Sequence, residues 1–156
     1  MPGTDAIKLL KKDHDEVRGL LKKLTDTTKN AVQTRRKLLE QVANEIAAHA
    51  KVEEEIFYPA CRNAARNEKE RQLLAEAREE HRAVEDLVLP DLKKTEPGTV
   101  EFGGRAKVLK ELVEHHADEE EDELFKFARK VLSKEKLEQL GEQMAARKEE
   151  LLAATA

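Results

Sequence analysis

Apolar residues recur at steps of three and four over most of this chain, and this helical period restricts its fold more than any other feature. Leu10, Val17, Leu21 and Leu24 show it in the first stretch, where His14 fills a gap between Leu10 and Val17. Aromatic residues make up only 3% of the 156 residues, and there are only six Gly and four Pro. A β-sandwich or barrel needs aromatic and β-branched strands with frequent turns between them. The pattern therefore predicts an all-α fold built from long helices.

Four breaks in the periodic pattern separate five expected helices. Thr4-Asp5 predicts an N-cap for the first helix, which ends in the turn-forming residues 25–30. The next three helices are expected at about 31–63, 68–89 and 105–132. Ser133 predicts the N-cap of a fifth helix, which carries Leu and Met along one side.

Proline and glycine mark the expected interruptions. Pro59 predicts a kink or a break late in the second helix, and Pro90 predicts the end of the third. The loop after the third helix is expected to include Glu96-Pro97-Gly98 and Phe102-Gly103-Gly104. Gly141 weakens the prediction that the last helix is unbroken.

Four long helices with short connections imply an antiparallel up-down four-helix bundle. We expect residues 1–132 to form this bundle and residues 133–156 to form an additional C-terminal helix. That last segment contains no His, so we interpret it as a helix that packs on the bundle, binds a protein partner or supports a homo-oligomer.

Charge and composition exclude several classes of partner. The formal net charge of −4, from 29 basic and 33 acidic residues, argues against nucleic acid and against an anionic membrane surface. No apolar run approaches the ~18 residues of a membrane span. The first residues show no signal-peptide pattern, and the single Cys61 cannot form an internal disulfide. These features predict a cytoplasmic protein.

Four of the five His lie on the apolar stripes of four different expected helices: His14, His49, His81 and His116. Burying several imidazoles without partners is costly, and a shared metal would provide a partner for all of them. Glu53 and Glu120 follow two of these His by four residues, so each pair projects from one helix face. We interpret the neighbouring Glu54, Glu55, Glu119 and Glu121 as a solvated acidic face.

This donor set of imidazoles and carboxylates indicates a particular kind of metal. It contains no thiolate, which distinguishes it from Cys-containing structural zinc sites and favours iron or manganese. Two bridging carboxylates with terminal His on facing helices would form a binuclear site. Ferritin-like bundles use Glu-x-x-His pairs, whereas the order here is His-x-x-x-Glu, so a ferritin-like assignment fits poorly.

Four sequence segments together resemble the hemerythrin family, specifically its bacterial HHE cation-binding branch. The segments are Asp13-His14-Asp15-Glu16, His49-x-x-x-Glu53 with Phe57-Tyr58-Pro59, Glu79-Glu80-His81, and His116-x-x-x-Glu120 with Leu124-Phe125. The resemblance covers about residues 5–130. It implies an antiparallel four-helix bundle with a non-haem di-iron centre of two iron ions, oxo- or hydroxo-bridged. It further implies that Glu53 and Glu120 are bridging ligands and that the four His are terminal ligands.

Two positions leave alternatives open. Oxygen-carrying hemerythrins have a His-x-x-x-His pair on the third helix, where this chain has His81 and Glu85. Glu85 is therefore a candidate metal ligand, with a surface position as the alternative. On the fourth helix, His115 would match the family members with a longer spacing to the carboxylate. The i,i+4 geometry and the apolar stripe favour His116.

Three functions are compatible with these residues. The leading hypothesis is a di-iron protein that binds, senses or reacts with a small ligand (O₂, hydrogen peroxide or NO), with oxidase or peroxide-consuming activity left open. The second is an iron-binding or iron-sensing module without turnover, and the third is an adaptor bundle without a metal. We interpret Tyr58 as an amphipathic residue at the core edge and Cys61 as a core filler.

Overall fold

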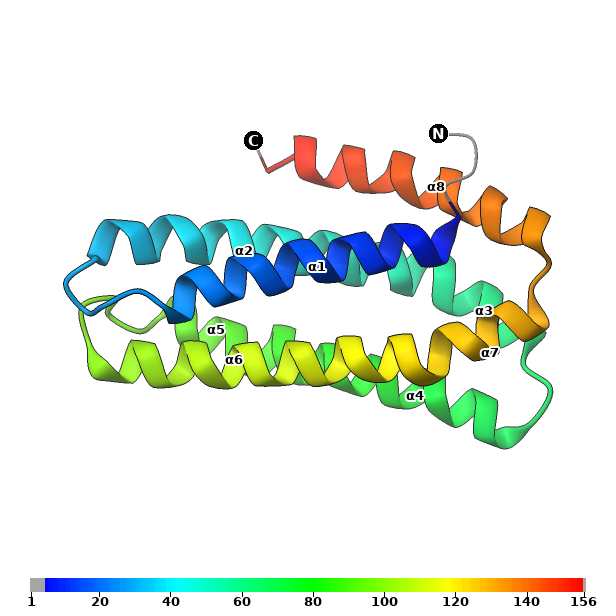
Figure 1. Ribbon diagram of the computed structural model, residues 1–156, viewed down its shortest axis with the longest axis horizontal. Coiled ribbons are helices and arrows are strands. Elements are labelled where there is room, and N and C mark those ends of the chain that lie inside the picture. Colours follow the sequence, from blue (N-terminus) through cyan, green and yellow to red (C-terminus); the bar gives the residue numbers. More distant parts are fainter. Residues whose placement is uncertain (1–4, 156) are drawn as a thin grey trace.

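The computed structural model describes residues 5–155, and every regular element in that range is helical. Four helical arms run antiparallel to their neighbours, and a fifth helix lies across one side of them (Figure 1). The first arm is α1 (Ala6–Thr25), and the second joins α2 (Val32–Val52), η1 (Glu53–Phe57) and α3 (Tyr58–Ala64). The third joins α4 (Glu68–Arg82), η2 (Ala83–Val88) and α5 (Leu89–Lys93). The fourth joins α6 (Val100–Glu119), η3 (Glu120–Leu124) and α7 (Phe125–Val131), and α8 is Lys134–Ala153. The predicted all-α bundle is confirmed.

Side-chain caps begin four of the helices. Asp5 accepts a hydrogen bond from the Lys8 amide at 2.8 Å, and Ser133 accepts one from the Lys136 amide at 3.0 Å. Asn67 and Thr99 cap α4 and α6 in the same way. The predicted caps at Asp5 and Ser133 are confirmed, whereas Thr4 lies outside the described residues.

The helical arm continues past Pro90, so the helix end expected there is wrong, whereas the kink or break expected near Pro59 corresponds to the π-helical turn η1 just before it. Each proline follows a π-helical turn and lies in the first turn of the next α-helix, where the missing amide has no helical acceptor to lose. The Tyr58 amide, for example, bonds to the Glu53 carbonyl five residues back. The third arm therefore continues to Lys93 rather than ending near residue 89.

The predicted loop at Phe102-Gly103-Gly104 is also wrong, because these residues form the first turns of α6. Thr99 caps this turn, and Phe102 is completely buried under the guanidinium of Arg35, 5.0 Å from its ring centroid. Burial of Phe102 and the cap together outweigh the low helix propensity of the glycine pair.

Helix α8 packs against α1 and α2 and is unbroken through Gly141. Its buried residues Leu137, Leu140 and Met144 join the apolar core near the start of α1. None of the helices in the described range is both long enough and apolar enough to span a membrane.

The buried apolar residues form two separate clusters along the bundle. One contains Leu10 of α1 and Leu124 of the fourth arm, and the other contains Val17 and Leu109 of the same two arms. Between the clusters lies a set of buried polar side chains, called the polar layer below: His14, His49, Glu53, His81, His116 and Glu120. The bundle thus holds an ionisable layer in the middle of its core.

Candidate metal centre

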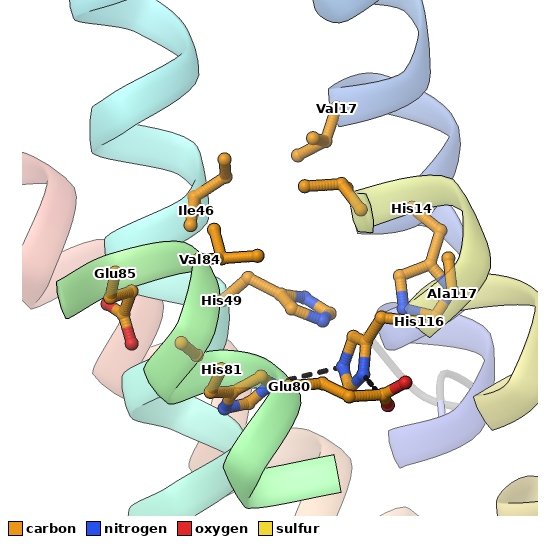
Figure 2. Close-up of a pocket in the computed structure, with 12 residues that line it drawn as sticks. His14, Val17, Ile46, His49, Glu80, His81, Val84, Glu85, His116 and Ala117 are labelled. Atoms are coloured by element: carbon orange, nitrogen blue, oxygen red, sulfur yellow. Dashed lines mark hydrogen bonds and ion pairs between the residues drawn. The ribbon is translucent and has the colours of Figure 1, made fainter. Parts of the chain in front are cut away.

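The polar layer contains six of the seven residues predicted as metal ligands. Its four imidazoles come one each from α1, α2, α4 and α6, and Figure 2 shows them converging on a common region. No residue of the layer is more than 8% exposed. Four helices that are distant in sequence therefore bring these donors together within the core.

Distances within the layer define two overlapping groups of donors. His14, His49, Glu53 and Glu120 form one group, and Glu53, His81 and His116 form the other, with ligand atoms within 4.8 Å of one another in each. Two such groups with a shared carboxylate have the composition of a binuclear metal site.

Both carboxylates contact imidazoles of both groups. Glu53 Oε1 lies 3.0 Å from His49 Nε2 and 3.1 Å from His81 Nε2. Glu120 Oε1 lies 3.0 Å from His14 Nε2 and 3.3 Å from His116 Nε2. Each carboxylate is therefore placed where it can bridge two cations.

The two carboxylates occupy special positions in their helices. Glu53 is the first residue of η1 and Glu120 is the first residue of η3, and both segments are π-helical. A π-helical turn contains an extra residue, and such turns are frequent at functional sites. The wide turn after Glu120 allows the consecutive residues Leu124 and Phe125 both to be buried. The ring of Phe125 then stacks on His14 with centroids 5.7 Å apart.

The outward nitrogens of the imidazoles are held by carboxylates from other arms. His14 Nδ1 donates to Glu121 at 2.8 Å, and His49 Nδ1 donates to Asp13 at 3.0 Å. His116 Nδ1 donates to Glu80 at 2.8 Å. These bonds orient each ring and leave Nε2 facing the layer, which is the usual support for a metal-binding His.

The supporting role of these carboxylates is not predicted from the sequence. The expectation that Glu54 and Glu121 belong to a solvated face is wrong, because Glu121 holds His14 and Glu54 Oε2 lies 3.7 Å from His81 Nδ1. A signal was present, since Asp13, Glu54, Glu80 and Glu121 each stand beside a predicted ligand in the sequence. Each of these carboxylates, however, contacts an imidazole on another arm than its own, so its sequence neighbour does not reveal its role.

Unpartnered buried atoms show that the layer fits a cation. Within the described residues, Glu53 Oε2 is buried without a hydrogen-bond partner, and His49 Nε2 is buried with a carboxylate oxygen 3.0 Å away but without a directed hydrogen bond. The Nε2 atoms of His81 and His116 face each other at 3.1 Å. Buried polar atoms are normally satisfied, and a cation would be a partner for both carboxylates and imidazoles.

The electrostatics of the layer depend on its carboxylates. Burial lowers the pKa of His81, but hydrogen bonds to Glu53 and Glu54 outweigh burial and raise this pKa to about 8. Burial raises the pKa of Glu120, but the His116 charge outweighs it and holds the pKa well below its usual range. Protons and metal therefore compete for the same imidazoles, so cation binding releases protons.

Tyr58 belongs to this network and not to the core edge, where the sequence analysis placed it. It is 3% exposed, and its hydroxyl donates to Glu120 Oε2 at 2.7 Å. The Tyr58 hydroxyl oxygen also lies 3.3 Å from His81 Nε2. Burial and the charges of Glu53 and Glu120 raise the Tyr58 pKa well above its usual value, so the phenol keeps its proton. Burial likewise raises the pKa of Cys61 to about 12.

Glu85, the seventh predicted ligand, does not join either group of the layer. Its carboxylate is directed away from His14, His49 and His116 (Figure 2). It lies on the outer side of His81, where Glu54, His81 and Glu85 form a separate, partly buried group. Of the two adjacent His on the fourth arm, His116 lies in the layer, while the side chain of His115 is 63% exposed and pairs with Glu119.

A small cavity of about 40 Å³ adjoins the four imidazoles. Its other walls are largely aliphatic and include Val17, Ile46, Val84 and Val113. A cavity needs at least about 10–15 Å³ by this measure to hold one water molecule, so the space has room for a small ligand. The aliphatic walls disfavour charged or strongly hydrated occupants.

Comparison with known proteins agrees with this geometry. Residues 5–128 match the model of the hemerythrin HHE cation-binding domain. A hemerythrin HHE cation-binding domain-containing protein of Mycobacterium kansasii has a similar crystal structure, with a TM-score of 0.83 and 31% identity. The alignment covers 96% of this chain and 88% of that chain.

Two curated relatives each share 29% identity with the chain. An uncharacterised protein of Mycobacterium tuberculosis aligns over 94% of this chain and 87% of its own length. A DNA nickase of Nostoc sp. aligns over 92% of this chain, which spans only 39% of that protein. The matched family model reaches into all four arms and covers every residue of the polar layer. The chain therefore belongs to the hemerythrin HHE cation-binding domain family.

Proposed function

We propose that the polar layer holds two iron ions in a non-haem di-iron centre that binds or reacts with a small ligand such as O₂, hydrogen peroxide or NO. The observation that carries this proposal is the pair of donor groups that share Glu53, with both Glu53 and Glu120 contacting imidazoles of both groups. A thiolate-free set of His and Glu suits iron. Iron held there would supply redox chemistry that side chains alone lack.

The protein residues around the layer favour a small ligand. The cavity beside the imidazoles is about 40 Å³, and the aliphatic side chains of Val17, Ile46 and Val84 line it. The group with His81 and His116 offers three protein donors, whereas the other group offers four. A cation held by fewer protein donors keeps a position open for an exogenous ligand. Tyr58 keeps a proton at its hydroxyl, 2.7 Å from Glu120.

The metal itself is tested by elemental analysis with an absorption spectrum of the protein as isolated. We expect two iron ions per chain in the parent protein and a large loss of iron in His116→Ala. The matched control is His115→Ala, which should retain the metal because its exposed side chain lies outside the layer. Iron content below one ion per chain, or equal content in the two variants, would contradict the proposal.

Reactivity is tested separately from binding. Ferrous protein prepared without oxygen and then exposed to air or hydrogen peroxide should consume the oxidant and develop ferric absorption bands. A second candidate function is an iron-binding module without turnover, and the position of the layer between two apolar clusters favours it, since metal binding would couple directly to folding. That module would show a large loss of thermal stability on chelation but negligible consumption of peroxide.

The compartment belongs to the same proposal. We place the protein in the cytoplasm because its single cysteine, Cys61, is a buried free thiol. Burial raises its pKa to about 12, so this thiol keeps its proton at neutral pH. Fractionation of cells that produce the protein tests this assignment.

A further inference from the structure

One lysine of the last helix contacts a carboxylate that supports an imidazole of the polar layer. Lys148 of α8 extends towards α1 and α2, and its side chain is only 16% exposed. Its ammonium lies 2.5 Å from Asp13 Oδ1, 3.4 Å from Glu45 Oε2 and 3.7 Å from Glu16 Oε2. Three carboxylates from the first two arms therefore face one cation from the fifth helix.

Asp13 connects this lysine to the polar layer. Its Oδ1 accepts from Lys148, and its Oδ2 accepts from His49 Nδ1 at 3.0 Å. The Asp13 side chain is only 4% exposed, so water does little to solvate its charge. The three side chains form a continuous chain of charged hydrogen bonds from α8 to His49 Nε2, which faces the metal centre.

The lysine is needed because the carboxylates around it would otherwise repel one another. Asp13, Glu16 and Glu45 have oxygens within 4.8 Å of one another. Glu45 Oε2 is buried without a hydrogen-bond partner, so Lys148 at 3.4 Å is its compensating charge. Without that charge, repulsion would push Asp13 away from Glu45 and loosen its bond to His49.

The carboxylate that supports His14 is also paired with a cation, and here the cation belongs to the four-arm bundle. Glu121, which holds His14 Nδ1, is itself paired with Arg18 at 3.0 Å. Arg18 belongs to α1, so this support needs no residue of α8. His49 differs in that the cation behind its carboxylate comes from the fifth helix.

We propose that Lys148 is a positioning residue for the metal centre: it fixes Asp13, which in turn fixes the His49 ring with Nε2 directed at the cations. The inference rests on the proposed metal site and adds that α8 is part of its support. The C-terminal helix is then required for full metal affinity as well as for packing.

The test compares Lys148→Met with Arg147→Met, its neighbour on α8. Arg147 pairs with Glu55 at 2.9 Å on the surface, and within the described residues it forms no hydrogen bond or ion pair with Asp13, so this control removes one cation from α8 and leaves the chain to His49 in place. Ferrous affinity is measured without oxygen against a competing chelator. Loss of support behind a metal-binding His typically weakens affinity by about 10–100-fold, and we expect about tenfold for Lys148→Met. Arg147→Met should bind like the parent, and Lys148→Arg should restore most of the affinity.

A second readout does not depend on metal. In the metal-free protein, the His49 Nδ1 proton should exchange slowly with water because Asp13 accepts it in a buried site, and NMR should show faster exchange in Lys148→Met only. Equal affinity and equal exchange in Lys148→Met and the parent would overturn the inference. If the parent binds no iron, the proposed function fails, and the proton-exchange measurement alone decides whether Lys148 positions His49.

Discussion

Tyr58 is the side chain whose substitution best separates hydrogen bonding from packing in the layer. Its ring stacks on His81 with centroids 5.4 Å apart, and its hydroxyl donates to Glu120. Tyr58→Phe keeps the ring and removes the donor to a buried carboxylate. Such bonds contribute about 1.5–3 kcal/mol, so we expect the free energy of unfolding of the metal-free protein to fall by about that amount in urea titrations. Unchanged stability would show that Glu120 does not depend on Tyr58.

The titration of the imidazoles predicts how stability depends on pH. Burial lowers the His81 pKa, but hydrogen bonds to Glu53 and Glu54 raise it to about 8 in the folded chain, against 6.5 as the ordinary value. Stability from the protonated ring is therefore complete below pH 6.5 and is lost as the pH rises through about 8. The pKa of His49 is also raised: burial lowers it, and the charge of Glu53 and the bond to Asp13 outweigh burial.

Thermal unfolding of the metal-free protein should therefore occur at lower temperature as the pH rises from 6.5 to above 8. Metal binding replaces the protons on Nε2, so the iron-loaded protein should not show this fall. A melting temperature of the metal-free protein that rises over this range would contradict the assignment of raised imidazole pKa values.

The donors in the layer could be predicted from sequence because each lies on an apolar stripe. The i,i+4 spacing of His49 with Glu53 is a property of one helix and needs no tertiary information. The carboxylates that hold the outward nitrogens of the imidazoles could not be predicted in the same way. Asp13 with His49 and Glu121 with His14 are contacts between arms, and their geometry depends on how the helices pack. Glu85 lies outside both donor groups of the layer, and its direction is set within a π-helical turn, which the sequence pattern does not reveal.

Among the helices, α8 offers a direct test of local capping. Ser133 accepts a hydrogen bond from the Lys136 amide at 3.0 Å and is the N-cap of the helix. Ser133→Ala should destabilise α8 by about 1 kcal/mol. Hydrogen exchange should then accelerate for the amides of α8 and leave α4 unchanged. Uniform acceleration over the whole bundle would show that α8 does not open independently.

Helix types and approximate bounds followed from the apolar period, but the π-helical turns did not. Three such turns interrupt the arms, and each is defined by hydrogen bonds to the residue five positions back. Periodicity cannot reveal one extra residue in a long stripe, so the sequence pattern predicts a kink or a break at Pro59 and a helix end at Pro90. The turns instead place each proline where its missing amide costs nothing.

For the molecule as a whole, the important feature is that an ionisable layer divides the hydrophobic core. On α1, Leu10 belongs to one apolar cluster and Val17 to the other, with His14 between them. On the second arm, Val52 and Ile46 stand on either side of His49 in the same way. The cluster with Leu10 also includes residues of α8, whereas the other cluster does not. We therefore expect the folding of the two apolar clusters, which form the two halves of the bundle, to be coupled through the polar layer between them.

Removal of the metal should weaken this coupling more than it weakens either half. A bound cation stabilises only the folded state, by ~4 kcal/mol at a thousandfold excess over its dissociation constant, so chelation should lower the melting temperature markedly. Hydrogen exchange should accelerate first next to the layer on all four arms, near His14, His49, His81 and His116. It should also accelerate in the half with Val17 and Leu109, whose apolar cluster contains no residue of α8. The half that includes Leu137 and Met144 of α8 should retain more protection. Comparison of loaded and chelated protein by hydrogen exchange tests this directly, because a layer without a coupling role would accelerate exchange equally in both halves.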